Sequence, residues 1–461
     1  MAEIFTRKFS EVSGGRFDPE FYIGQTIQIA TYPLKNFVKI KSGKRIPKGR
    51  SYANTTTTYK YLRVDDLDSE ILEIDIDKLK SIDKDIFTLL ERYEIHNDEV
   101  ALSIAGTIGK VFIFHNTTSN RVILTENCVK LQAQDNLLPK FLSLILKTDF
   151  LQSQMKRQYI QTTIPKLAIE RIKELQIPSI PPFSTQQHII DLMDKAYKAK
   201  QEKENKAKEL LDSIDSYLLE ELGIILPLRA NNTLDSRIYT QKISALSGSR
   251  FDANYHQPYY KKFEQALESG KYKTLRLVDI CQFRRGSFPQ PYGNQEWYGG
   301  ANAMPFVQVA DIDDNFELKE KTNQQISQLA QPKSVFVSQN TIILSIQGTI
   351  GRVAITQYDC YVDRTIAIFT ELSNLLNQHF LAYMLSILFK NKADTARGIT
   401  LKTITKEEFR NFKIPLPPLT EQERIAKEIA QRKATAKALK QEAKELLESA
   451  KKEVEHIILG G

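Results

Sequence analysis

The side chains that most often carry chemistry are scattered along this sequence without a catalytic spacing. Its six histidines lie far apart and form no metal-ligand pattern. Gly106-Thr-Ile-Gly-Lys110 resembles a phosphate-binding glycine loop, but its spacing is too short, and no G-x-G-x-x-G follows a strand. No Asn-Pro-Pro-Tyr tetrapeptide occurs, and the acidic residues form no nuclease-like constellation. The sequence therefore predicts a recognition part rather than an enzyme.

Two polar, basic segments, Lys41–Lys60 and Gln282–Tyr298, carry groups that suit a DNA contact. Arg and Lys can form bidentate hydrogen bonds with guanine in the major groove, and Asn and Gln can do so with adenine. Lys and Thr can hold phosphates, and interleaved Tyr and Trp can stack. A solvated loop without a partner is the alternative. The predicted contact residues in these segments are Lys44, Arg45, Lys48, Arg50, Tyr52, Asn54, Tyr59, Arg284, Arg285, Gln290, Tyr292, Asn294, Gln295 and Trp297.

Two further contacts are predicted where a Gly-Thr-Ile-Gly turn is followed by a cation, Lys110 in one place and Arg352 in the other. Glycine permits a left-handed or crowded backbone, so such a turn can approach a phosphate closely. A purely structural tight turn is the alternative. The basic, Thr-rich stretches Arg157–Lys166 and Arg397–Lys406 are weaker candidates for backbone contact.

The overall charge favours an acidic partner. The 461 residues carry a net charge of +8 and a pI near 9.0, which is a modest basic excess. Cys128, Cys281 and Cys360 form no C-x-x-C pair, so we expect reduced, buried thiols rather than disulfides or a zinc ribbon. No apolar run is long enough to span a membrane, and we expect a soluble cytoplasmic protein.

The chain repeats itself. Leu102–Ile113 and Leu344–Ile355 share nine of twelve residues at an offset of 242, and further blocks recur in the same order at offsets of 234 to 245. The offset drifts mostly between residues 40 and 62 and their counterparts 280 to 307. The two copies therefore share a frame, and the polar segments are the part that varies.

Each copy ends in a long predicted helix. Ser184 and Thr420 follow a double proline and are predicted to cap the helix N-termini, and Gly223 is predicted to end the first helix. Apolar residues then recur at alternating four- and three-residue steps, as in a coiled-coil seam. A helix of about 38 residues would span roughly 57 Å. We expect the two helices to pair with each other, antiparallel; independent hairpins and a dimerisation coil are the alternatives.

The remainder of each copy mixes strands and helices. Val100–Phe114 is β-branched around its glycine turn and predicts strand, turn, strand, whereas Leu137–Leu151 has helical periodicity. The expected divisions are a first head (1–182), a long spacer helix (183–223), a linker (224–246), a second head (247–418) and a second spacer helix (419–458).

Four motifs resemble one known family. They are Gly43–Pro47 with its counterpart Gly286–Pro289, the Pro-aromatic…Asp-Ile run Pro305–Ile312, the glycine turn Leu344–Gly351, and the Ile-Pro…Pro-Pro…Gln run Ile414–Gln422. With these the chain resembles the specificity (S) subunit of type I restriction-modification systems along essentially its whole length. The first copy departs from the pattern, because it lacks the Gly-Gly before Tyr61 and has one extra residue in Ile177–Pro182.

The resemblance implies an α+β fold: two globular α/β target-recognition domains separated by two long antiparallel coiled-coil helices, with an internal pseudo-two-fold repeat. It implies a non-catalytic subunit that reads a bipartite, asymmetric double-stranded DNA target. Two adenine-DNA methyltransferase (modification) subunits would dock on the helices, and restriction/translocase subunits would join them. S-adenosylmethionine and ATP/Mg would then belong to those partners, with no cofactor or metal in this chain. A coiled-coil protein-binding scaffold and a stand-alone DNA enzyme are the alternatives.

Overall fold

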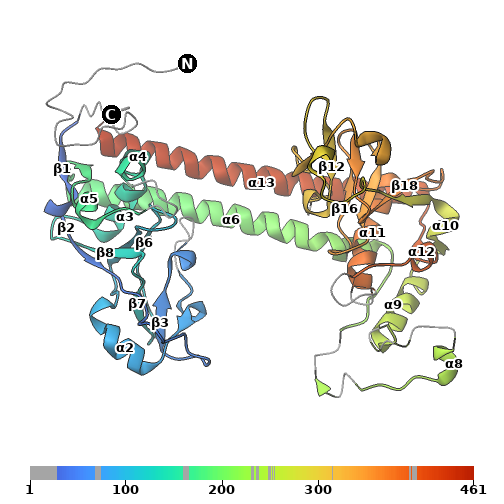
Figure 1. The fold of residues 1–461 in the computed structure, drawn as a ribbon, viewed down its shortest axis with the longest axis horizontal. Coiled ribbons are helices and arrows are strands. Elements are labelled where there is room, and N and C mark those ends of the chain that lie inside the picture. Colours follow the sequence, from blue (N-terminus) through green and yellow to red (C-terminus); the bar gives the residue numbers. More distant parts are fainter. Residues whose placement is uncertain are drawn as a thin grey trace. The chain divides into compact units, whose positions relative to one another are not determined.

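The computed structural model describes residues 29–67, 74–158, 166–229, 233–234, 238–247, 251, 253, 255–313, 315–393, 396 and 402–460. The chain divides into a first unit, Met1–Glu204 with Lys440–Gly461, and a second unit, Asn205–Leu439 (Figure 1). Each unit holds one head and one half of each long helix. No helix in the described part is long and apolar enough to cross a membrane.

The first head is built on two main sheets. A four-stranded antiparallel sheet has the order β2 (Val38–Ser42), β8 (Cys128–Ala133), β5 (Glu99–Ser103), β6 (Val111–Ile113). A three-stranded sheet has the order β4 (Lys80–Ser81), β3 (Tyr59–Leu62), β7 (Arg121–Leu124), and β3 and β7 are parallel. The short strands β1 (Thr31–Pro33) and β9 (Gln176–Pro178) pair separately. The helices are α2 (Lys84–Leu90), α3 (Pro139–Lys147), α4 (Asp149–Gln158) and α5 (Ile169–Lys173).

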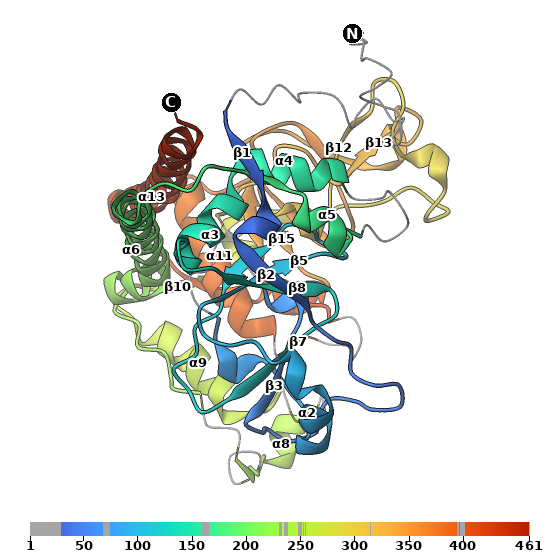
Figure 2. The same ribbon diagram turned by 90° about the vertical axis from the view of Figure 1, so that its left-hand side faces the viewer.

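The buried strand β5 explains how these layers pack. Successive side chains of a strand point to opposite faces. Val100 and Leu102 lie in the apolar cluster that contains Phe141 of α3, whereas Ala101 lies in a second cluster with Leu124 of β7. The four-stranded sheet is therefore covered by helices on one face and by the second sheet on the other (Figure 2).

The second head repeats this topology, with one additional strand in its second sheet. Its four-stranded sheet has the order β11 (Gln282–Arg285), β18 (Ile366–Thr370), β15 (Ile342–Ser345), β16 (Val353–Ile355). Its mixed sheet has the order β13 (Gln324–Ile326), β12 (Met304–Val307), β17 (Cys360–Val362), β14 (Val335–Val337), and β12 and β17 are parallel. Strand β10 (Thr274–Arg276) pairs with β19 (Lys413–Pro415). The helices are α8 (Ile243–Leu246), α9 (Pro258–Glu268), α10 (Leu277–Ile280), α11 (Gln378–Lys392) and α12 (Lys406–Arg410).

The helix predicted at Leu137–Leu151 is interrupted. Thr148 is extended (φ −62°, ψ 149°) between α3 and α4, and its hydroxyl donates to the carbonyl of Ile145 at 2.7 Å. The corresponding α11 of the second head runs unbroken from Gln378 to Lys392. The helical periodicity thus correctly predicts helical structure here, but it does not indicate the break at Thr148.

The predicted pairing of the long helices α6 (Phe183–Glu221) and α13 (Leu419–Leu459) is confirmed within each unit. In the first unit Ile189 and Met193 share a cluster with Val454 and Ile458; in the second unit Leu218 and Leu222 share one with Ile425 and Ile429. Residues early in α6 therefore meet residues late in α13, which makes the pair antiparallel (Figures 1 and 2). Gly223, at φ +64°, follows the end of α6 as predicted.

The predicted helix caps are wrong. The first turns begin at the preceding prolines, because Gln186 N donates to Pro182 O and Gln422 N donates to Pro418 O, both at 3.1 Å. Ser184 and Thr420 therefore lie inside the helices. Gln186 and Gln422 are buried, and each side chain binds three backbone groups just outside its helix.

Candidate nucleic-acid interface

Both variable segments are fixed to the heads at an equivalent glycine. Gly43 N donates to Cys128 O and Gly286 N donates to Ile366 O, each at 3.0 Å. A Cβ at Gly43 would overlap the carbonyl oxygen of Thr125, and one at Gly286 would overlap that of Val362. The backbone of each segment thus crosses the turn between two strands at a distance that only glycine permits.

The first-head segment is mostly exposed. Lys44, Arg45, Lys48 and Arg50 are all on the surface. Two of them are held by acidic side chains: Arg45 Nε lies 2.5 Å from Glu126 Oε1, and Arg50 pairs with Asp85 of α2. These arginines thus have restricted positions, whereas the two lysines are exposed cations suited to phosphate.

The aromatic residues of this segment differ in role. Tyr52 is exposed at 38% and packs 6.1 Å from the ring of Tyr61. Tyr61 is buried, which raises the pKa of its phenol to about 12, and its hydroxyl donates to Lys44 O at 2.9 Å. Tyr59 is half-buried on the ring of Phe87, 4.7 Å away, so it belongs to the packing of α2. Asn54 is exposed.

In the second head the predicted loop begins as a strand. Arg284 and Arg285 lie on β11, paired with β18, and both are exposed. Arg284 Nη2 donates to the carbonyl of Phe336 at 3.1 Å, and Arg285 Nη2 donates to the hydroxyl of Thr403 at 3.2 Å. Because β11 is hydrogen-bonded to β18, the backbone of Arg284 and Arg285 is fixed, and their side chains have fewer possible directions than they would have in a free loop.

The rest of this segment combines surface and core. Gln290, Tyr292 and Gln295 are exposed. Asn294 caps a short 3-10 turn, accepting from Glu296 N at 3.2 Å. Trp297 is only 6% exposed and packs with Phe306, Ile326 and Ala330, and its indole N–H donates to Pro291 O at 3.0 Å. The expectation that Trp297 offers a stacking surface is therefore wrong, because its ring covers the mixed sheet.

The Gly-Thr-Ile-Gly turns have a structural explanation. Ser103 and Ser345 are fully buried, and their hydroxyls accept the N–H of Lys110 and Arg352, both at 2.8 Å. The Lys110 ammonium donates to Leu67 O at 2.7 Å, and the Arg352 guanidinium donates to Ile312 O at 3.0 Å. These two cations satisfy carbonyls of the adjoining 3-10 turns.

Several sequence predictions lie outside the described residues. Most of Arg157–Lys166 and half of Arg397–Lys406 are among them, as are the repeated block Ser13–Asp18 and most of its counterpart Ser247–Asp252. Two bridges flank the basic stretches, Ala105 with Lys166 and Gln347 with Thr403.

Sequence reasoning missed two exposed or half-exposed side chains beside the variable segments, Glu126 and Arg364. Each lies two residues beyond the strand parallel to β3 or β12, at the turn that Gly43 or Gly286 crosses. The signal was present in the repeat, since Leu124-Thr-Glu126 aligns with Val362-Asp-Arg364 and only the last pair reverses charge.

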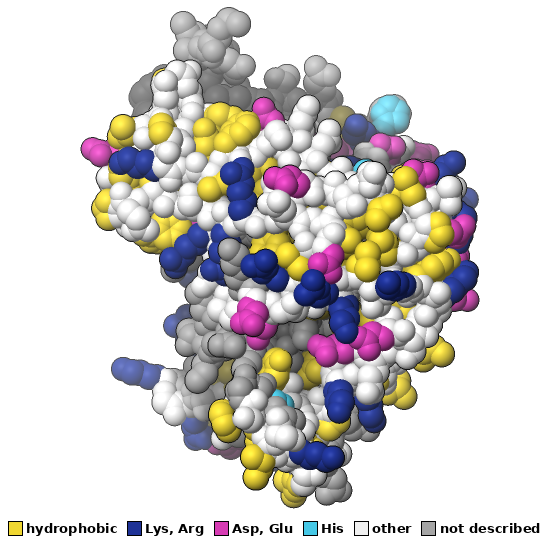
Figure 3. Space-filling model, turned by 90° about the vertical axis from the view of Figure 1, so that its right-hand side faces the viewer, with side chains coloured by type: hydrophobic (Ala, Val, Ile, Leu, Met, Phe, Trp, Pro, Cys, Tyr) yellow, Lys and Arg dark blue, Asp and Glu magenta, His cyan; other side chains and the backbone are white. Residues whose placement is uncertain are grey.

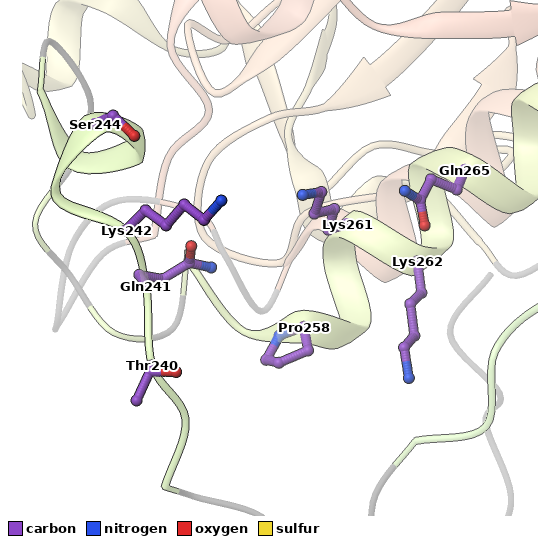
Figure 4. A pocket seen from close by; sticks show the side chains of 8 residues that line it. All are labelled: Thr240, Gln241, Lys242, Ser244, Pro258, Lys261, Lys262 and Gln265. Carbon is purple, nitrogen blue, oxygen red and sulfur yellow. The ribbon is translucent and has the colours of Figure 1, made fainter.

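The surface electrostatics are mixed. On the face in Figure 3, basic side chains lie among acidic ones rather than in one block. In the second unit, an open groove of about 760 Å³ has Lys242 and Lys261 pointing toward each other, with Lys262 directed away (Figure 4). Its lysines are exposed, so the groove has charge for a phosphate but no buried group that would orient a ligand.

The described residues contain neither a reactive cysteine nor a metal-binding group. The three cysteines are free and buried, as predicted, and burial raises the pKa of each thiol to about 12, which leaves it unreactive at neutral pH. No group of His, Cys, Asp or Glu in the described part could hold a metal ion.

Comparisons with known proteins agree with the repeated fold. Residues 27–212 and 269–449 match the type I restriction modification DNA specificity domain. The chain is 32% identical over 127 residues to the MjaX specificity subunit of a type I restriction enzyme from Methanocaldococcus jannaschii, covering 27% of this chain and 29% of that protein. It is 22% identical over 175 residues to the MjaVIII specificity subunit of the same organism, covering 38% of each. The chain thus spans well under half of these curated relatives.

A solved structure from work on complex assembly and conformational transition of the type I R-M system has the same fold. It is 17% identical, with a TM-score of 0.53, and the match covers 94% of this chain and 96% of that one. The family match covers both heads and most of both long helices. The chain belongs to the type I restriction-modification DNA specificity (S) subunit family, whose members bind DNA.

Proposed function

We propose that each head reads one half of a bipartite, asymmetric double-stranded DNA target. The observation that carries this proposal is the contrast within the repeat. The two heads share the order of their four-stranded sheets and the parallel pair of their second sheets, whereas the exposed side chains around Gly43 and Gly286 differ. Two readers on one frame with different contact residues suit two different half-sites.

The long helices would set the gap between the half-sites and dock two adenine-DNA methyltransferase subunits. Their antiparallel seam supports a fixed length, because buried residues recur along both helices. The chain itself would be non-catalytic. S-adenosylmethionine would be bound by the methyltransferase partners, and ATP and Mg by restriction/translocase subunits.

DNA binding can be tested by mobility shift of the full-length chain with random-sequence duplex DNA at rising salt. Phosphate contacts predict that log K falls linearly with log salt concentration, by about one unit of slope per contact. Lys44→Ala and Lys48→Ala should each reduce the slope by about 1. Lys173→Ala is the matched control, since Lys173 pairs with Glu170 on α5.

Absence of binding, or binding that salt leaves unchanged, would contradict the proposal and favour a scaffold that binds protein. Methylation or cleavage of DNA by the purified chain alone would contradict its non-catalytic role.

A further inference from the structure

The two heads bring a pair of side chains into contact at the same point of the fold. One member follows the anchoring glycine by two residues, Arg45 in the first head and Phe288 in the second. The other member, Glu126 or Arg364, lies on the turn that this glycine crosses. Arg45 and Glu126 form an ion pair at 2.5 Å, and the Arg364 guanidinium lies 4.7 Å from the Phe288 ring centroid. Both heads retain this contact. In the first head the arginine is the residue after the glycine, whereas in the second head it is the residue on the turn.

In the second head, Arg364 is exposed and held by stacking. Stacking on an aromatic face fixes the plane of a guanidinium while leaving its N–H edge available. The neighbouring Asp363 binds Thr365, since its Oδ1 accepts from Thr365 N at 2.9 Å and from Thr365 Oγ1 at 2.6 Å. Among the described residues, no hydrogen bond or ion pair involves the Arg364 side chain. Phe288 in turn packs 4.8 Å from the exposed Tyr292.

In the first head, Arg45 is held by a carboxylate instead. The Arg45 side chain is 77% exposed and its hydrogen bond to Glu126 uses Nε, so this bond does not occupy the terminal N–H groups. Burial opposes ionisation of Glu126, but the hydrogen bonds from Arg45, Thr125 and its own backbone, together with the charge of Arg45, leave the pKa of this carboxyl below its usual value. Thr125 Oγ1 also donates to Glu126, at 3.0 Å, which restricts the carboxylate.

We propose that Arg364 and Arg45 are the guanine-reading residues of the two heads, with Phe288 and Glu126 as their positioning residues. An arginine fork held in a fixed plane matches the N7 and O6 acceptors of guanine in the major groove. A bidentate contact with a base edge needs a guanidinium held in one plane, which both the aromatic and the carboxylate contact favour. This inference rests on the proposed function of the heads as DNA readers.

The test is selection from a random duplex pool by the full-length chain, followed by sequencing of the bound fraction. Arg364→Gln should lose its preference for a G·C pair at one position of one half-motif, by roughly 5- to 150-fold, and leave the other half-motif unchanged. Arg45→Gln should do the same in the other half-motif. Arg364→Lys should weaken the preference while keeping the salt slope, because lysine retains the charge without the rigid, stackable fork.

Phe288→Leu retains Arg364 but removes its platform, so it should weaken the preference at that same base position only. Arg276→Gln is the control, since it removes an exposed arginine of the second unit that pairs with Asp279. If Arg364→Gln and Arg45→Gln weaken binding to all sequences equally, the arginines contact phosphate and the inference is overturned while the proposed function stands. If the wild-type chain selects no motif at all, the proposed function itself fails.

Discussion

At the scale of single residues, the repeat separates side chains that hold the backbone from side chains that face outward. Gly43 and Gly286, and likewise Ser103 and Ser345, have equivalent neighbours in both heads. The side chain two residues after each anchoring glycine differs between the copies, Arg45 in one and Phe288 in the other. The shared glycines and serines therefore fix the backbone in both heads, while the side chains that could distinguish DNA sequences differ.

The close approach at Gly43 predicts a stability effect. Gly43→Ala should lower the free energy of unfolding by about 2 kcal/mol or more, because the methyl group would overlap the Thr125 carbonyl. Gly49→Ala is the control: a Cβ there meets nothing within 4 Å, so only its positive φ of +83° costs energy, about 1 kcal/mol. Urea unfolding measures both variants. Equal effects would show that the crossing is not tightly packed.

Lys433 predicts a pH dependence. Burial lowers the pKa of its amine to about 8, from the ordinary 10.5; the amine lies 4.3 Å from the Phe316 ring centroid and donates to Asn315 O. Between these pH values the unfolded chain binds more protons, so the free energy of unfolding rises with pH and falls as pH drops through 8. The total is at most about 3 kcal/mol.

Lys433→Met removes this titration. The difference in unfolding free energy between wild type and variant, measured by urea unfolding at several pH values from about 7 to 11, should shift in favour of wild type as pH rises. Glu317, Asp313 and Lys437 also influence this amine, and all three remain in the variant. Parallel pH profiles of the two proteins would contradict the assignment.

Sequence alone located the variable segments but not the roles of all their residues. Composition identified Trp297 as a stacking residue, yet only the packed structure shows that it covers Phe306 and Ile326. Lys110 and Arg352 were predicted to contact phosphate because each follows a Gly-Thr-Ile-Gly turn whose backbone can approach a phosphate closely. Their carbonyl partners are 40 to 46 residues away in the chain. Such long-range hydrogen bonds leave no periodic signal.

At the scale of elements, the long helices were the most predictable part. Their apolar residues recur at alternating four- and three-residue steps, and Ile189, Met193, Ile425 and Ile429 of this series are buried. Their N-terminal residues were not predictable in the same way, because the caps depend on the loops before them. The break between α3 and α4 falls at Thr148, whose extended backbone the helical periodicity did not indicate.

The buried glutamines at the helix starts predict an element-level effect. Gln422 accepts from Asn377 N at 2.9 Å and donates to Leu375 O and Pro417 O at 2.8 Å. Gln422→Ala should lower the free energy of unfolding by about 3 kcal/mol, because buried backbone groups lose their partners. Gln187→Ala, which removes only an exposed contact with Asp191, should change it by less than about 0.5 kcal/mol. Thermal unfolding of the two variants measures both effects. Similar losses of stability would contradict a stabilising role for the hydrogen bonds of Gln422.

At the scale of the whole molecule, the proposed function requires the helices to determine the gap between half-sites. Seven residues inserted after Lys203 in α6 and before Glu442 in α13 would preserve the 2.6 Å ion pair between these side chains. The insertion adds roughly 10 Å of helix, which should lengthen the preferred gap by about three base pairs. Selection from random duplex DNA measures the gap. Unchanged spacing would exclude the helices as the determinant.

The central claim, that the two heads read two separate half-sites, is tested most directly by mapping methylated adenines across the genome of cells carrying the complete system. The account predicts one methylated motif made of two different half-motifs separated by a gap of fixed length and free sequence. A single uninterrupted motif, two identical half-motifs, or methylation without a sequence preference would contradict it.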